Sequence, residues 1–178
     1  SRPTCSYCGT TKRYISNKFA YDNNFDVVVT GHNLDDEASF IFGNLLNWNT
    51  QYLAKQGPLL PGEGKFVKRV KPLYETPERE IAAYAWAVSI DYTTEICPYA
   101  KGAITLYYKE VLNQLEERRP GTKIRFVRGF LKKRHLFEGD VEKWEVKECK
   151  ICGMPSGGEV CSFCRIWGLK EPVNLTIK

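Results

Sequence analysis

The sequence lacks any long apolar run. None of its segments approaches the roughly 20 apolar residues that a membrane-spanning helix needs. The N-terminus has no basic patch followed by an apolar stretch, so a secretory signal is not indicated. The 178 residues are 43% hydrophobic and 13% aromatic, which excludes a disordered tail and allows one core with a small satellite unit. We expect a soluble cytoplasmic protein without a membrane partner.

The cysteine pattern does not favour disulfides. Seven cysteines are present, an odd number, and six of them form three C-x-x-C pairs. The pairs are Cys5/Cys8, Cys149/Cys152 and Cys161/Cys164, and Cys97 stands apart. In a chain without a secretory signal, paired cysteines of this kind are more typical of metal binding.

Positive charge is concentrated in one segment. The net charge is only +5, but from Arg118 to Arg134 the chain has eight Lys or Arg and no acid. This asymmetry favours an anionic partner, nucleic acid first. Phe126 and Phe130 add side chains suited to stacking on bases. A solvated basic helix face is the alternative.

The first third of the chain has the order of an α/β nucleotide-handling domain. Spaced apolar residues predict a helix over 10–23, and an apolar run predicts a buried strand over 25–29. A turn at 30–33 then leads into a helix over 34–48 with acids in its first turn. Strand, glycine turn and helix start therefore follow one another as such a domain requires.

The rest of the chain reads as helices separated by turn signals. Residues 57–64 are rich in Gly and Pro, which predicts a mobile loop. Thr76 as N-cap with Pro77 at the first helical position predicts a helix to Val88. The remaining expectations are a short strand over 91–95, a helix over 103–118, a break at Pro120-Gly121, and a basic helix whose Ile124, Val127 and Leu131 share one face.

Two C-x-x-C pairs near the C-terminus predict a zinc site. Eight residues separate Cys149/Cys152 from Cys161/Cys164, and four thiolates close a tetrahedral shell with no open position. The unit either helps to grip RNA or only fixes the end of the chain. Within it, Ser156-Gly157-Gly158-Glu159 resembles the start of a phosphate loop, but we interpret it as a turn because no strand-to-helix context surrounds it.

The other three cysteines leave several interpretations open. Cys5 and Cys8 alone would suit half of a second zinc site, and a single Cys97 is commonly a buried core thiol. The three together would suit an iron-sulfur cluster. Such a cluster would have one iron without a protein ligand, at which a substrate or sulfide can bind.

Three motifs in fixed order carry a family resemblance. They are Cys5-Ser-Tyr-Cys8-Gly9-Thr-Thr-Lys12-Arg13-Tyr14, Thr30-Gly31-His32-Asn33-Leu34-Asp35-Asp36-Glu37-Ala38 and Glu95-Ile-Cys97-Pro98-Tyr99-Ala100. With the C-terminal zinc unit, they resemble the tRNA 2-thiouridine synthetases of the TtuA group, within the TtcA/TtuA superfamily of PP-loop ATP pyrophosphatases.

The resemblance implies an α/β fold of the adenine nucleotide alpha hydrolase type with a parallel sheet. Residues 1–117 would be the C-terminal part of the PP-loop ATP pyrophosphatase domain, 118–143 a basic helical segment that contacts tRNA, and 144–178 a C-terminal zinc finger. The implied enzyme is an ATP-dependent tRNA-uridine 2-sulfurtransferase. ATP with magnesium adenylates a tRNA uridine, most simply the T-loop uridine at tRNA position 54, and sulfur then displaces AMP to give 2-thiouridine.

The resemblance also assigns residues and partners. Cys5, Cys8 and Cys97 would hold a 4Fe-4S cluster, Lys12 and Gly31 would contact ATP, and Lys12 with Asp36 would be catalytic. His32 and Arg13 receive no firm role, and Asp35 and Glu37 are expected to be solvent-facing or capping groups. The implied partners are tRNA, a ubiquitin-like sulfur carrier with a C-terminal thiocarboxylate, and a second copy in a homodimer.

One family element is not found in the sequence. The strand followed by S-G-G-x-D-S that cradles phosphates is absent, and the chain opens just before Cys5. The resemblance therefore describes a longer enzyme, and we expect these 178 residues to be inactive alone. A wobble-uridine thiolase of the same superfamily and a non-catalytic zinc-containing RNA-binding module remain the alternatives.

Overall fold

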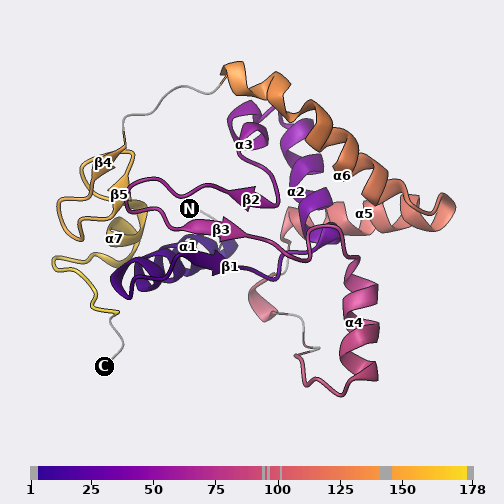
Figure 1. The fold of residues 1–178 in the computed structure, drawn as a ribbon, viewed down its shortest axis with the longest axis horizontal. Coiled ribbons are helices and arrows are strands. Elements are labelled where there is room, and N and C mark those ends of the chain that lie inside the picture. The colour runs from indigo at the N-terminus through magenta and orange to yellow at the C-terminus, as the bar shows by residue number, and fades with distance from the viewer. Residues whose placement is uncertain (1–3, 94, 96, 101, 141–145, 176–178) are drawn as a thin grey trace. The chain divides into compact units, whose positions relative to one another are not determined.

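The computed structural model describes residues 4–93, 95, 97–100, 102–140 and 146–175. The chain divides into two compact units, each built from several segments (Figure 1). Unit 1 comprises residues 1–29, 59–70 and 143–178, and unit 2 comprises residues 30–58 and 71–142. The three predicted domains, in contrast, follow one another along the sequence. Their last boundary, at 143/144, lies outside the described residues, and the domain boundaries stay a prediction.

Unit 1 begins with the long helix α1 (Thr4–Asp22) and the strand β1 (Val27–Val29). The predicted helix is confirmed but begins at Thr4, six residues earlier than expected, so Cys5 and Cys8 are helical. The predicted strand is confirmed in place but not in burial, because Val29 is 60% exposed. Burial of a strand on both faces requires helices on both sides of the sheet, and α1 is the one described helix with several contacts to β1.

The sheet of unit 1 has the order β1-β3-β2. β3 (Lys68–Val70) runs parallel to β1 and antiparallel to β2 (Leu59–Leu60). The prediction that 57–64 is only a loop is therefore wrong at residues 59–60, which form a strand although Pro58 and Pro61 flank them. Gly62 is needed in this hairpin because a Cβ there would lie 2.9 Å from the carbonyl oxygen of Phe66.

The C-terminal part of unit 1 is a small knuckle-like region. It contains β4 (Lys147–Glu148), β5 (Pro155–Ser156) and α7 (Ser162–Trp167), with β4 and β5 paired antiparallel. Its short elements bury little apolar area, so other interactions must hold it together.

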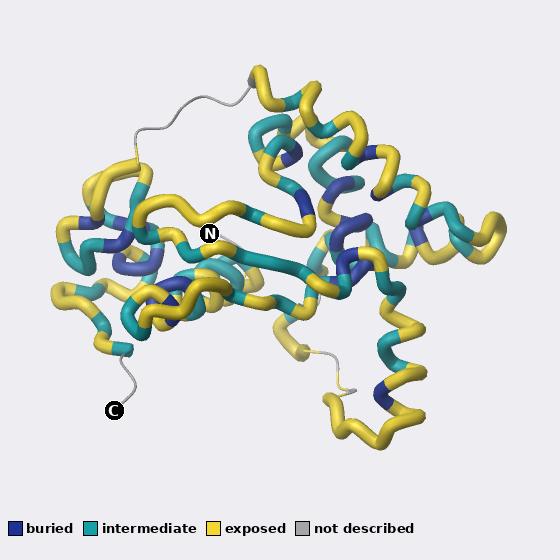
Figure 2. The backbone as a smooth tube through the Cα atoms, in the orientation of Figure 1, coloured by how far each residue is buried: buried dark blue, intermediate teal, exposed yellow. Residues whose placement is uncertain are grey.

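Unit 2 is a helical assembly around α2 (Leu34–Leu46). The other helices are α3 (Thr50–Ala54), α4 (Glu78–Ala87), α5 (Ile104–Arg118) and α6 (Thr122–Lys133), with two 3-10 turns, η1 (Pro98–Ala100) and η2 (Arg134–Asp140). α2 packs against both α5 and α6, and most of its residues are buried or half-buried, whereas most residues of α4 are exposed (Figure 2). No helix within the described residues is both long and apolar enough to cross a bilayer.

The core of unit 2 confirms the predicted apolar face of the basic helix. Val127 is fully buried, and Ile124 and Leu131 pack against the same cluster. Phe130 is buried in this core and stacks on Phe137, while Phe126 packs against it and meets the edge of Phe42. The prediction that Phe130 stacks on bases is therefore wrong, whereas base stacking by the half-buried Phe126 stays a prediction.

Helix ends follow the predicted signals with two corrections. Asn33 caps α2 reciprocally with Asp36, and the helix predicted over 103–118 begins at Ile104. α4, however, has Pro77 at its cap position and begins at Glu78, one residue later than predicted. The strand predicted over 91–95 is wrong at residues 91–93 and 95, which are irregular, and residue 94 lies outside the described part of the chain.

Candidate metal centre and functional site

The four cysteines of the predicted zinc site converge. Their Sγ atoms all lie within 4.8 Å of one another, and those of Cys152 and Cys161 are 3.8 Å apart. One pair lies at the β4–β5 turn and the other at the start of α7. Among the residues that the structure describes, this is the one group of three or more His, Cys, Asp or Glu that is gathered so closely.

The local backbone turns amides toward the sulfurs. The Cys161 N–H donates to Cys149 Sγ at 3.3 Å, and the Cys164 N–H donates to Cys161 Sγ at 3.4 Å. Gly153, with φ of +69°, closes the first turn by donating its N–H to the Cys149 carbonyl at 2.8 Å. Such donors stabilise thiolates, which are the form that binds a metal ion.

The thiols of this cluster titrate differently. Burial raises the pKa of Cys149, but N–H donors from Cys161, Cys152 and Ile151 outweigh it and lower that pKa to about 6. Burial and then the neighbouring thiols raise the pKa of Cys164. Four adjacent thiolates repel one another unless a cation lies among them, so this donor set fits a bound metal ion.

Two other parts of unit 1, α1 and the β2–β3 hairpin, contact the metal centre. The Tyr14 ring of α1 stacks on Phe163 with centroids 3.8 Å apart, and the Trp167 indole N–H donates to the Thr11 hydroxyl at 3.0 Å. From the β2–β3 hairpin, Lys65 donates to the Gly153 carbonyl at 2.9 Å. The cysteine turns are therefore held by side chains far away in sequence.

The predicted turn at Ser156-Gly157-Gly158-Glu159 is confirmed. β5 ends at Ser156, whose hydroxyl accepts from the Gly158 N–H at 3.2 Å. The next helix begins only at Ser162. A phosphate loop needs a helix directly after its glycines, which is lacking here.

The cysteines predicted to hold an iron-sulfur cluster are exposed. Cys5 and Cys8 lie one turn apart on α1, and Lys12 follows one turn later, also exposed. Cys97 is exposed just before η1. Cys5 and Cys8 belong to unit 1 and Cys97 to unit 2, so each is described within its own unit, and their convergence stays a prediction.

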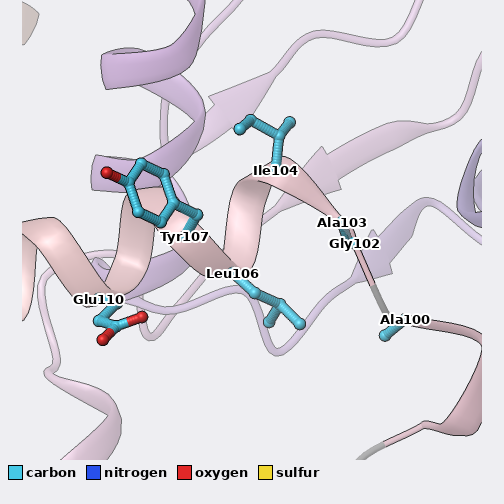
Figure 3. Close-up of a pocket in the computed structure, with 7 residues that line it drawn as sticks. All are labelled: Ala100, Gly102, Ala103, Ile104, Leu106, Tyr107 and Glu110. Atoms are coloured by element: carbon cyan, nitrogen blue, oxygen red, sulfur yellow. The ribbon is translucent and has the colours of Figure 1, made fainter.

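A shallow, mainly apolar pocket lies next to the Cys97 segment in unit 2 (Figure 3). It is formed by the end of η1, by Gly102 and Ala103, and by the first turns of α5. Its lining residues are Ala100, Gly102, Ala103, Ile104, Leu106, Tyr107 and Glu110. None of the predicted site residues lines it.

The glycine turn and its acids lie at the start of α2. Gly31 is exposed, and a Cβ there would meet nothing within 4 Å. His32 shares a hydrogen bond of 3.0 Å with the Thr30 hydroxyl. Asp36 accepts from the Asn33 N–H and forms an ion pair of 2.6 Å with Lys109 of α5.

Sequence reasoning missed Lys109. Burial alone would lower the pKa of Lys109, but Asp36 and then Glu78 outweigh it and raise the pKa. Lys109 therefore stays cationic beside the predicted catalytic carboxylate. The three acids in the first turn of α2 were the available signal, since so much negative charge needs nearby cations.

The prediction that Asp35 and Glu37 are solvent-facing or capping groups is wrong about solvent, but Asp35 does cap the first N–H of α4. Asp35 is buried, accepts from the Glu78 N–H at 2.7 Å and pairs with Lys123. Burial raises its pKa, but the Glu78 amide and Lys123 outweigh that and lower it. Glu37 is fully buried and pairs with Lys71 at 2.7 Å, yet burial dominates and raises its pKa.

The basic segment divides into internal and external cations. Lys123 is buried, Arg128 pairs with Glu75 at 2.5 Å, and Arg134 donates to the Gln56 carbonyl at 3.1 Å. Lys132 and Lys133 are exposed at the end of α6. The cations left for an external anion are therefore fewer than the sequence suggests.

Comparisons with known proteins identify close relatives, although no family model matches the chain. It is 65% identical over 176 residues to a tRNA-5-methyluridine(54) 2-sulfurtransferase of Pyrococcus horikoshii, covering 99% of this chain and 57% of that protein. The enzyme of the same name from Thermotoga maritima is 49% identical over 166 residues, covering 93% of this chain and 54% of that protein.

A solved structure agrees with these relatives. The U34-tRNA thiolase NcsA from Methanococcus maripaludis, determined with its 4Fe-4S cluster, matches with a TM-score of 0.77 and 32% identity. The match covers all of this chain and 57% of that protein, so the chain spans somewhat more than half the length of its relatives. The chain belongs to the TtuA/NcsA group of tRNA thiolases, an enzyme family with an α/β fold, and corresponds to a part of such an enzyme.

Proposed function

We propose that the chain is part of an ATP-dependent tRNA-uridine 2-sulfurtransferase that acts on the T-loop uridine at position 54. The similarity to enzymes named for this reaction, over nearly the whole chain, carries the proposal. Working in the cytoplasm, the enzyme would bind tRNA and take sulfur from a ubiquitin-like carrier with a C-terminal thiocarboxylate. Exposed aromatic side chains on α4, such as Tyr84 and Trp86, support a partner surface suited to a homodimer.

Cys5, Cys8 and Cys97 would hold a 4Fe-4S cluster. The NcsA relative carries such a cluster, and the exposure of all three thiols in this chain leaves them accessible as ligands. A cluster held by three cysteines supplies one iron at which sulfur can bind. The helical spacing of Cys5 and Cys8 lets both thiols point to the same side of α1.

Lys12, Gly31 and Asp36 would serve the adenylation step with ATP and magnesium. Adenylation places negative charge on phosphate oxygens, which the exposed ammonium of Lys12 would offset. Gly31 leaves open space beside its backbone, which allows a nucleotide to approach closely. Asp36 is suited to hold magnesium or to accept a proton from the uridine, and it forms an ion pair of 2.6 Å with Lys109.

The four-cysteine centre would hold zinc. Two thiolates on one tetrahedral zinc, with Zn–S of about 2.3 Å, lie about 3.8 Å apart. The separation of Cys152 Sγ and Cys161 Sγ is 3.8 Å. The cysteine sulfurs of a 4Fe-4S cluster bind four different irons and lie farther apart, so the geometry supports a single ion.

A wobble-uridine thiolase is the second candidate, because the NcsA relative is named for uridine 34. Its lower identity, 32% against 65%, favours the T-loop reaction. Mass spectrometry of tRNA from a deletion strain separates the two, since loss of thiolation in the T-loop or in the anticodon identifies the target.

Anaerobic purification followed by metal analysis tests the cluster. We expect brown protein with iron and sulfide beside one zinc per chain. Cys97→Ser should abolish the iron and keep the zinc. Colourless protein with zinc alone would favour the non-catalytic RNA-binding module instead. Thiolation itself is assayed in a longer enzyme that also carries the S-G-G-x-D-S loop.

A further inference from the structure

Arg69 is a half-buried cation without a partner among the described residues. It lies at the centre of β3, opposite Val28 of β1 and Leu60 of β2. Its Nε atom is buried and has no hydrogen-bond partner in the described part of the chain, where no carboxylate pairs with the guanidinium either. A guanidinium in such a place is costly unless an anion completes it.

A second cation lies beside it. The guanidinium of Arg13, on α1, folds back along the helix, so that a Cβ added to Gly9 would lie 3.3 Å from its Nη1 atom. Asn17, one turn after Arg13 on α1, accepts from the Val67 N–H at 2.9 Å, so α1 lies against the chain that enters β3 two residues before Arg69. In agreement, burial and then the charge of Arg13 lower the pKa of Arg69. Within the described residues, no ion pair or side-chain hydrogen bond engages the Arg13 guanidinium either.

Two unpaired arginines that repel each other do not stabilise the fold. The buried lysines of unit 2 each have a carboxylate, as in the pairs Lys71–Glu37 and Lys123–Asp35. The fold thus compensates buried positive charge where the charge serves packing. An arginine pair left uncompensated is instead arranged for an anion that comes from outside.

We propose that Arg13 and Arg69 together bind one phosphate group of a substrate. Planar guanidiniums bind phosphate oxygens in pairs, which makes arginine the residue suited to this task. Arg13 folds over Gly9, directly after Cys8, so the phosphate would lie near the predicted cluster ligands. The phosphate would belong either to the tRNA backbone or to ATP, and this choice of molecules rests on the proposed function.

The test compares three variants of a longer enzyme that also carries the S-G-G-x-D-S loop. Arg69→Met and Arg13→Met remove the charge and keep a long apolar side chain. The matched control is Lys68→Met, because Lys68 is exposed and adjacent on the same strand, where alternation turns it to the other face of the sheet. Binding of labelled tRNA is followed by fluorescence anisotropy over a salt series. Binding of ATP and of inorganic pyrophosphate is followed by their effect on thermal unfolding.

We expect Arg69→Met and Arg13→Met each to weaken binding of one ligand class by about tenfold, the loss of a charge-assisted contact. If the class is tRNA, the slope of log affinity against log salt should also fall by about one. Loss confined to ATP and pyrophosphate would identify a nucleotide phosphate as the source. Lys68→Met should change each affinity less than twofold. Unchanged binding in both arginine variants, or an equal loss in Lys68→Met, would overturn the site.

Two controls keep the result interpretable. Without ligand, Arg69→Met should be at least as stable as the original chain, because an uncompensated buried charge is removed. Arg13 is exposed, so its replacement tests the site even if the Arg69 variant unfolds. Iron content should not change in either variant. Phosphate binding by a chain that holds no iron would contradict the proposed function and leave this site intact.

Discussion

The two sets of cysteines differ in how much of each site the fold builds in advance. The four C-terminal thiols are gathered, three of them are buried, and backbone amides already point at their sulfurs. The three thiols predicted to hold the cluster are exposed and belong to different units. A closed, four-ligand shell suits an ion that only stabilises, whereas accessible ligands suit a group that must exchange sulfur with substrates.

The first turn of α2 repeats this contrast between neighbouring acids. Asp35 and Glu37 are buried in ion pairs, while Asp36 remains partly exposed next to Lys109. The buried acids join α2 to distant segments, and the accessible one is the acid suited to chemistry. One motif therefore combines a structural and a functional part.

The strongest way to break this comparison is to remove one buried thiol. Cys164→Ser should cost most of the metal-dependent stability of unit 1, since structural zinc sites contribute about 10–16 kcal/mol of apparent binding free energy. Zinc content and limited proteolysis measure the loss. Cys8→Ser is the matched change on an exposed thiol, and it should alter the free energy of unfolding by no more than about 0.5 kcal/mol. Equal destabilisation by both would contradict the distinction.

Asp35→Asn tests the same contrast between acids. It should destabilise the protein by about 3 kcal/mol or more, because Lys123 stays buried without its partner, and Asp36→Asn should cost about 1 kcal/mol or less. The folded-state pKa of Asp35 is lowered. Its stabilisation is therefore complete above the unfolded pKa of about 4 and is lost as the pH falls through the folded value. Urea unfolding across pH 3–7 should show that this acid-side slope is reduced in Asp35→Asn.

The exposed end of α6 gives a smaller effect on binding. Replacing Lys132 and Lys133 with alanine should weaken tRNA binding by about tenfold and lower its salt slope by up to about two. Arg134 is left out because it donates to the Gln56 carbonyl and its loss would also disturb unit 2. Arg128→Ala is the control, since its charge is already engaged by Glu75. Binding that survives the double change would remove this segment from the interface.

Local sequence signals predicted the local features well. Paired cysteines eight residues apart predicted the metal centre, and glycine, proline and capping residues predicted most helix boundaries within a few residues. The buried face of α6 was found from helical spacing, and the same spacing applied to Phe130, between Val127 and Leu131, would have placed that ring in the core too. Helical periodicity therefore predicts the place of this ring better than the basic composition around it.

The missed features depend on residues far away in sequence. Asp35 is buried because Lys123 lies 88 residues later, and Glu37 because Lys71 lies 34 residues later. The exposure of β1 likewise depends on which helices cover its two faces and not on its own apolar run. No local sequence pattern predicts these long-range contacts, so the burial of charged residues was the least predictable property of the site.

The smallest predicted effect concerns the support of the metal centre by α1. The Tyr14 hydroxyl is buried without a hydrogen-bond partner in the described residues, and the Cys152 thiol lies close enough to raise the pKa of Tyr14 further than burial alone. Once Cys152 is a metal-bound thiolate, this hydroxyl can donate to it, which would orient the ligand.

Tyr14→Phe keeps the stack on Phe163 and should cost about 1 kcal/mol of stability, with faster zinc release to a chelator. Tyr7→Phe, on an exposed turn of the same helix, should release zinc at the original rate. If Tyr14→Phe also leaves that rate unchanged, the four thiols hold the ion without help from α1. The metal centre then depends only on its own cysteines and their backbone, which sharpens its difference from the exposed cysteines.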